Sequence, residues 1–115
     1  MSEYRLDRLG KQLQEEIGAM IVGGKVKDPR VDTFLSISRV EVSRDLSYAD
    51  VYVSSFESEK KVKEGVYGLT SAAGFIQSQL NAKMHIRATP KLRFHADTSL
   101  RDGFDLVKKI EGLND

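Results

Sequence analysis

Hydrophobic residues recur along the chain with two different spacings, which together predict an alternation of helices and strands. A stripe at helical spacing runs through Tyr4–Val22 and is ended by Gly23-Gly24. In Thr33–Val42 and Tyr48–Ser55 apolar and polar residues alternate instead, as they do in the half-buried strands of a β-hairpin. The alternation changes phase at Ser38-Arg39, where we expect a β-bulge.

The helical spacing returns after Ser58, where Ser58 or a neighbouring residue is the expected N-cap, and continues to about Met84. On its way it passes through the step Ala72-Ala73-Gly74. Glycine inside a helix costs about 0.5–1 kcal/mol relative to alanine, so Gly74 is expected to mark a kink or a close approach of another backbone. The pattern therefore predicts a pair of helical segments that meet at an angle.

Pro90 stops any helix and opens a last strand in which apolar and polar side chains again alternate. Beyond this strand, Ser99 and Asp102 resemble a capping box for a final helix, and the tail Glu111–Asp115 is expected to fray. The residues expected to form the core are Leu13, Ile17, Ile37, Val51, Val53, Leu69, Ile76, Leu80, Leu92, Phe94 and Phe104.

This order of elements predicts a single α+β domain over residues 1–115, with helices covering one face of a three-stranded sheet. The other face of the sheet is expected to be largely wet. A right-handed crossover makes the third strand parallel to the second. Whether the third strand lies beside the second or the first is left open by the pattern.

The composition narrows the class of protein. The chain has 115 residues and no cysteine, which excludes disulfides and thiolate metal sites. No apolar run approaches the roughly 18–20 residues of a membrane-spanning helix, and the apolar segment of a signal peptide is missing. We therefore expect a soluble, cytoplasmic, monomeric protein that uses no metal and no cofactor.

The net charge of +1 conceals an uneven distribution of charge. Four bases and no acid lie between Asn81 and Ala96, and three more bases lie at the start of the first helix. Such clusters are typical of a protein that binds a polyanion such as RNA. The alternatives are a solvated face for the helical group and ion pairs within the fold for the others, such as Arg87 with Asp28 or Glu41. The candidate RNA-binding residues are Arg5, Arg8, Lys11, Lys83, Arg87, Lys91 and Arg93.

The sequence gives weaker support for catalysis, metal binding or other nucleic-acid contacts. The sequence has no nucleophile elbow, phosphate-binding loop or paired metal ligands. His95 could be oriented by Asp97 for acid–base catalysis, although a surface position is the simpler interpretation. Tyr48 and Tyr52 could stack on nucleotide bases, but we favour packing across the strands. Gly65–Gly68 spells the GxxG of KH domains, yet its apolar middle residues favour close helix packing instead.

Several strings, in their shared order and spacing, resemble the ribosome-binding factor A family over nearly the whole chain. These strings are Asp28-Pro29-Arg30, Val42–Leu46 followed by Ala49–Ser54, Ala72-Ala73-Gly74 with Ile76 and Leu80, Ile86-Arg87 with Pro90, Leu92 and Phe94, and Asp97 with Ser99.

The resemblance implies a type II KH-like fold in which an Ala-x-Gly kink, here Ala72 to Gly74, replaces the GxxG between paired helices. It also implies a non-enzymatic bacterial assembly factor that binds the free small (30S) ribosomal subunit or precursor 16S rRNA. Such a factor supports maturation and 5′-end processing of this RNA and matters most in the cold. The family commonly has a basic residue soon after the kink, where this chain has Gln77.

The residues themselves leave two other functions open. One is a protein–protein adaptor that docks through the kinked helix and the hairpin without touching RNA. The other is a small acid–base enzyme built on His95.

Overall fold

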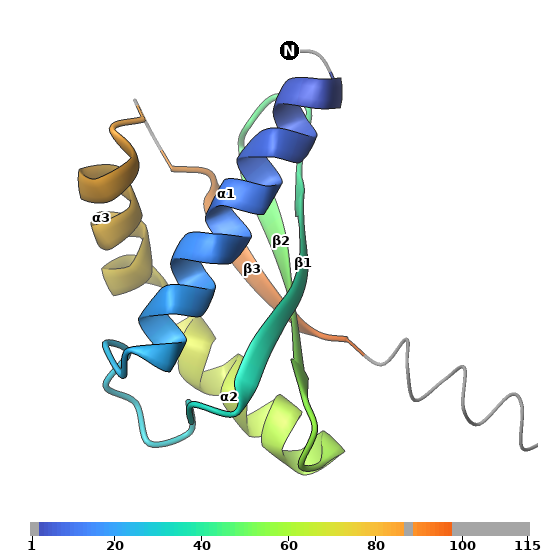
Figure 1. The fold of residues 1–115 in the computed structure, drawn as a ribbon, viewed down its shortest axis with the longest axis vertical. Coiled ribbons are helices and arrows are strands. Elements are labelled where there is room, and N and C mark those ends of the chain that lie inside the picture. Colours follow the sequence, from blue (N-terminus) through green and yellow to red (C-terminus); the bar gives the residue numbers. More distant parts are fainter. Residues whose placement is uncertain (1–2, 87–88, 98–115) are drawn as a thin grey trace, which may run out of the picture.

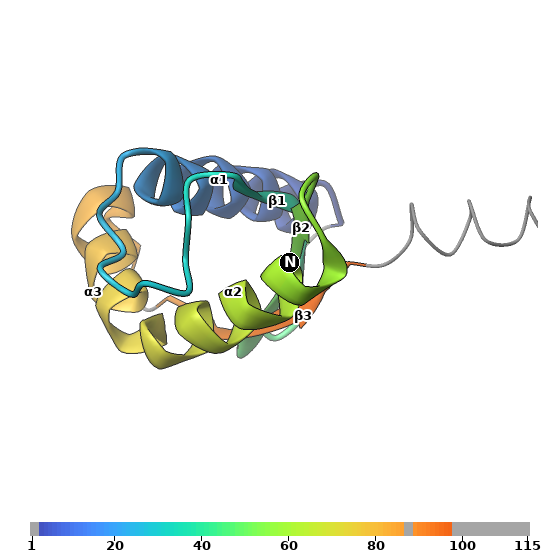
Figure 2. The ribbon, with the colours of Figure 1, turned by 90° about the horizontal axis from the view of Figure 1, so that it is seen from below.

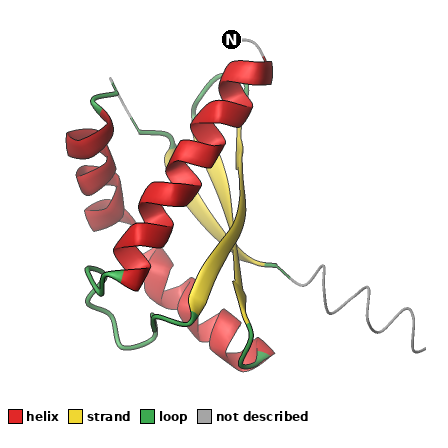
Figure 3. Cartoon of the chain, viewed as in Figure 1, coloured by secondary structure: helices red, strands yellow, loops and turns green. Residues whose placement is uncertain are grey.

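The computed structural model describes residues 3–86 and 89–97. Its elements follow the order that the sequence predicts (Figure 1, Figure 3). The expected final helix and the tail Glu111–Asp115 lie outside the described residues. The elements are α1 (Glu3–Val22), β1 (Leu35–Val42), β2 (Tyr48–Ser55), α2 (Glu59–Ser71), α3 (Ala73–Met84) and β3 (Lys91–Ala96).

The three strands form one sheet in the order β1-β2-β3. β1 and β2 are antiparallel, and β3 lies parallel to β2 with Phe94 opposite Val51, so the third strand neighbours the second. The expected bulge is confirmed by a shift of register between Ile37 and Arg39. Gln14 of α1 satisfies a backbone group beside this bulge, because its Nε2 donates to the carbonyl of Ile37 at 2.9 Å.

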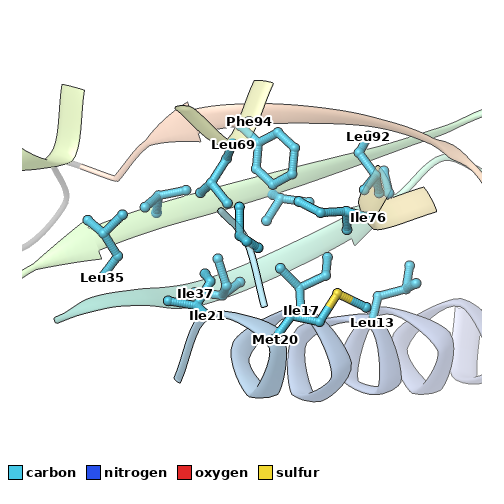
Figure 4. Close-up of a cluster of buried hydrophobic side chains, with 14 of the residues drawn as sticks. Leu13, Ile17, Met20, Ile21, Leu35, Ile37, Leu69, Ile76, Leu92 and Phe94 are labelled. Atoms are coloured by element: carbon cyan, nitrogen blue, oxygen red, sulfur yellow. The ribbon is translucent and has the colours of Figure 1, made fainter. Parts of the chain in front are cut away.

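All three helices pack on the same face of the sheet, which confirms the predicted α+β architecture (Figure 2). Between the two layers lies the core, where side chains from α1, from the α2–α3 pair and from all three strands meet (Figure 4). Every predicted core residue that the structure describes is buried, whereas Phe104 lies outside the described part. Burial of each such side chain stabilises the fold by about 1.5–3 kcal/mol.

The break between α2 and α3 falls at Ala72, whose backbone has φ −91° and ψ 3°. This break confirms the predicted division into two helices. At the other end of α2, the Oγ of Ser58 caps the helix by accepting a hydrogen bond from the backbone N–H of Lys61 at 3.1 Å. Gly74 lies inside the first turn of α3, and a Cβ placed there would meet no atom of the described residues within 4 Å outside its own stretch of helix. Of the two roles expected for Gly74, the structure therefore shows the break beside it and not a close approach of another described backbone.

Close approaches occur at other glycines. A Cβ on Gly65 would lie 2.4 Å from a methyl carbon of Leu35, and one on Gly68 would lie 2.8 Å from Val31. The pair thus lets α2 pack tightly against the segment that enters β1, as the sequence interpretation favoured. On α1, a Cβ on Gly10 would lie 2.8 Å from the backbone carbonyl oxygen of Val40.

Candidate nucleic-acid interface

The candidate cations that the structure describes lie toward one end of the molecule. The start of α1, the β1–β2 turn, the end of α3 and the start of β3 all lie at this end, which we call the turn end (Figure 1). The turn is joined to α1 by an ion pair between Arg44 and Glu3 at 3.6 Å. The fold therefore gathers two groups of bases that are far apart in the sequence, although α1 covers the inner face of the sheet and β3 presents its bases on the outer face.

The bases of α1 are solvent-exposed. Leu6 and Leu13 turn toward the core, so Arg8 and Lys11 are directed away from it by the helical period. Arg8 and Lys11 make no ion pair with any residue that the structure describes. Arg5 is exposed too but interacts with a neighbouring group. This face of α1 is thus available to a polyanion.

The bases near β3 are more constrained than the sequence indicates. Arg93 donates two hydrogen bonds to Asp50 of the neighbouring strand, at 2.9 and 3.1 Å, and its guanidinium lies 4.3 Å from the centre of the Tyr48 ring. Lys83, on the last turn of α3, forms an ion pair of 3.0 Å with Glu16 of α1. The absence of acids in the local sequence does not leave these two cations unneutralised.

Lys91 is exposed and, within residues 3–86 and 89–97, has no ion-pair partner. Arg87 lies outside the described residues. The two acids that the sequence offered as partners for Arg87 have other partners: Asp28 pairs with Arg30 at 2.8 Å, and Glu41 pairs with Arg39 at 3.2 Å.

Asp50 organises the outer face of the sheet. Its Oδ1 lies 2.8 Å from Nε2 of His95, and the same carboxylate binds Arg93. Partial desolvation by itself would raise the pKa of Asp50, but hydrogen bonds from His95 and Arg93 outweigh this effect and lower it. The partner of His95 is thus an acid on β2, whereas Asp97 accepts a hydrogen bond from Ser38.

Planar side chains from all three strands pack against one another on the same face of the sheet. The guanidinium of Arg39 lies 4.1 Å from the centre of the Tyr52 ring, and the rings of Tyr52 and His95 are 5.3 Å apart with an interplanar angle of 32°. The favoured cross-strand packing of Tyr52 is therefore confirmed. We call the outward layer formed by Arg39, Tyr48, Tyr52, Arg93 and His95 the open sheet face.

The Asp28–Arg30 pair connects the α1–β1 loop to the end of α2 beside the helix break, and we call this pair the clamp. The guanidinium of Arg30 binds Asp28 through two hydrogen bonds of 3.0 and 2.8 Å and also reaches the Oγ of Ser71 at 3.1 Å. The side-chain hydrogen bond from Arg30, with a second from the backbone N–H of Arg30, lowers the pKa of Asp28 to about 2.

Sequence reasoning missed the hollow beside this clamp. It is lined by Lys25, Lys27, Ser71 and the half-exposed Phe75, at the point where α2 gives way to α3. Ala72 provides no side-chain cap for α3, whose first backbone N–H groups lack partners within the helix. The available signal was the pair of lysines immediately before Asp28, a spacing too common to single out.

Within the described part of the chain, no three acidic or histidine side chains are grouped so that they could hold a metal ion. No described helix has the length and apolar character needed to cross a bilayer.

The α-β-β-α-α-β order around a mixed three-stranded sheet, with a break between the paired helices, is that of a type II KH-like domain. The family model that matches residues 5–110 is described as ribosome-binding factor A. The chain belongs to the ribosome-binding factor A family.

Relatives and solved structures agree with this assignment. A ribosome-binding factor A of Treponema denticola is 57% identical over 113 residues, which cover 98% of this chain and 86% of the relative. The corresponding protein of Borreliella burgdorferi is 43% identical, with 93% of this chain and 89% of the relative covered.

Among solved structures, the crystal structure of ribosome-binding factor A from Thermus thermophilus matches with TM-score 0.68 and 26% identity, covering 79% of this chain and 93% of that one. A solution NMR structure of a putative ribosome binding factor A of Thermotoga maritima matches with TM-score 0.69 and 33% identity, covering 83% and 89%. A model of the Thermus thermophilus factor, fitted into a cryo-EM map of its complex with the 30S subunit, matches with TM-score 0.65 and 26% identity, covering 81% and 96%.

Proposed function

We propose that this protein binds the small ribosomal subunit in the cytoplasm during assembly, contacts its 16S rRNA and catalyses no reaction. The observation that carries the proposal is membership of the ribosome-binding factor A family, together with a relative that has been fitted into a 30S complex. Maturation of the subunit, including processing of the 5′ end of 16S rRNA, and a greater requirement in the cold are the steps that this binding would support.

The charge distribution supports a contact with RNA phosphates. Arg8 and Lys11 on α1 and Lys91 on β3 are exposed at or near the turn end, without ion pairs among the described residues. A cation without a protein partner exchanges only solvent and counterions when it binds a phosphate, so its contribution to affinity is not reduced by a broken salt bridge. Arg5, Lys83, Arg87 and Arg93 complete the proposed RNA-binding set.

The first test is sedimentation. Cell extract is fractionated on a sucrose gradient, and we expect the protein to travel with free small subunits rather than with 70S ribosomes or at the top of the gradient. Recovery of the protein at the top alone, at low as well as physiological salt, would contradict the proposal. A cold-sensitive loss of mature 16S 5′ ends in a deletion strain would support the finer role.

Salt dependence separates RNA binding from the adaptor hypothesis. Each phosphate that a lysine or arginine neutralises lowers the logarithm of the binding constant by about 0.7–0.9 per tenfold increase in salt. We expect a steep slope for purified subunits and for protein-free 16S rRNA. An adaptor that docks through apolar contacts would show a shallow slope with subunits and no binding to the bare RNA.

A further inference from the structure

The aromatic side chains of the open sheet face have no role in a contact made only with phosphates. All three helices lie on the other face, so nothing among the described elements covers it. Of its planar side chains, Tyr48 is 39% exposed, and the side chains of Arg93 and His95 are 48% and 43% exposed. An ordered, partly exposed layer of aromatic rings and guanidinium planes is the arrangement on which unpaired bases stack.

We propose that the open sheet face is a second contact surface, on which unpaired bases of a single-stranded RNA segment stack. The inference rests on the proposed function and adds to it the kind of RNA that is bound and the side chains that bind it. In this arrangement a base lies against the layer of Tyr48 and Arg93 or that of Tyr52 and His95, and the phosphates lie toward Lys91.

Three features of the face fit this occupant. Asp50 binds Arg93 and His95, and these two side chains pack against Tyr48 and Tyr52, so little side-chain freedom is lost when a base arrives. Lys91 lies directly opposite Tyr48 in the register and supplies a cation without an ion pair in the described part of the chain. Ser36 and Ser54, whose Oγ atoms are 3.0 Å apart, add donors and acceptors for base edges.

The charges of the face favour bases over a row of phosphates. Arg39 is paired with Glu41 and Arg93 with Asp50, so Lys91, which lies beside the face, is the described lysine or arginine left there to release counterions. Binding by this surface should therefore depend on aromatic side chains more than on salt. The bases of α1 should show the opposite behaviour.

The test uses the full-length protein with two probes, a single-stranded oligoribonucleotide of about 12 nucleotides and purified small subunits. Tyr52→Leu and, separately, Tyr48→Leu are compared with wild type by fluorescence anisotropy at several salt concentrations. Tyr52→Phe keeps the ring, and Tyr67→Leu removes a 68% exposed tyrosine on α2, away from the face. Circular dichroism establishes that each variant is folded.

We expect Tyr52→Leu and Tyr48→Leu each to bind the oligoribonucleotide at least tenfold more weakly, a loss of about 1.4 kcal/mol, with an unchanged salt slope. The control substitutions Tyr52→Phe and Tyr67→Leu should leave binding within about twofold of wild type, and a duplex of the same sequence should compete poorly. The two variants of the open sheet face should also bind subunits more weakly.

Wild-type affinity of both Tyr52→Leu and Tyr48→Leu for the oligoribonucleotide would overturn the inference. So would normal oligoribonucleotide binding combined with lost subunit binding, which would make the occupant a protein. Failure of the wild-type protein to bind subunits would instead remove the proposed function, while the oligoribonucleotide measurement would still decide the role of the face.

Discussion

At the scale of single residues, hydrogen-bond donors lower the pKa values of three aspartate carboxylates. Asp28, Asp45 and Asp50 all have lowered pKa values, but for different reasons. Arg30 acts on Asp28, whereas hydrogen bonds from Ser47 and Ser43 lower the pKa of Asp45 to about 2. Each of these carboxylates is held by neighbours that favour its charged form.

The Asp28–Arg30 pair predicts a specific loss of stability in acid. Because the pKa of Asp28 falls from 3.8 to about 2 on folding, its contribution is present above pH 3.8 and is lost as the pH falls toward about 2. We expect the difference in free energy of unfolding between wild type and Asp28→Asn to shrink across this range, as measured by urea denaturation.

Arg30→Gln removes the same interaction from the other side and should reproduce the effect. A difference between wild type and Asp28→Asn that stays constant from about pH 5 to about pH 2 would contradict this account of the clamp.

A substitution of Lys83 affects an ion pair within the fold as well as the surface charge, so its binding experiment needs a control variant. Its ammonium lies 3.0 Å from Glu16, whose side chain is 27% exposed. Replacing Lys83 therefore leaves a partly buried carboxylate unpaired as well as removing a charge from the surface. A weaker binding of RNA by such a variant would be informative only beside the variant Glu16→Gln, which removes the pair while keeping the cation.

At the scale of elements, α1 can lie close to β1 because Gly10 has no side chain. We expect Gly10→Ala to lower the free energy of unfolding by about 1–3 kcal/mol, since the new Cβ would lie 2.8 Å from the carbonyl oxygen of Val40 and the helix must shift.

Gly18→Ala on the same helix is the matched control. A Cβ there meets no atom of the described residues within 4 Å outside its own stretch of helix, so the higher helix propensity of alanine should raise stability by about 0.5–1 kcal/mol. Thermal or urea unfolding of the two variants measures both effects. Equal effects of the two substitutions would mean that helix propensity, not the contact with β1, determines the result.

The break between α2 and α3 gives a second prediction at this scale. Gly74 lies inside α3 with open space around it, so Gly74→Ala should be tolerated or stabilise the protein by up to about 1 kcal/mol. Gly68→Ala should destabilise it, because its Cβ would lie 2.8 Å from Val31. Urea denaturation distinguishes the two outcomes, and destabilisation by Gly74→Ala would show that the break needs a glycine there.

At the scale of the whole molecule, the turn end and the opposite end, where α2 starts, offer a comparison of charge clusters. We expect reversal of Arg8, Lys11 and Lys91 to glutamate to weaken binding to small subunits by about 3 kcal/mol, roughly 1 kcal/mol for each contact. The slope of log affinity against log salt should fall by roughly 2 to 3. These three positions avoid Arg93 and Lys83, whose reversal would also break ion pairs.

The control reverses three exposed lysines, Lys60, Lys61 and Lys63, at the start of α2. It makes the same change of net charge at the other end of the molecule and should have a much smaller effect on subunit binding. Equal losses in the two triple variants would indicate a nonspecific effect of net charge. Sedimentation and filter binding measure the affinities.

The periodicity of the sequence determined the elements and the residues that they bury. A helical or a strand period can bury only one set of side chains, so Leu13, Ile17, Val51 and Phe94 could be assigned to the core without knowing the partner of any strand. The cap at Ser58 and the phase change at the bulge are equally local signals. These predictions succeeded because a residue and its near neighbours carry all the information they need.

Only the tertiary structure decided which residues meet across the fold. Asp50 neutralises Arg93 from 43 positions away because parallel pairing sets β3 beside β2, and no count of charges in one segment reveals such a partner. The same holds for Lys83 with Glu16, and for the glycines, since Gly10 and Gly68 approach neighbouring segments closely and Gly74 does not. Ion pairs and backbone approaches depend on distances between elements, and strand order and helix packing fix those distances.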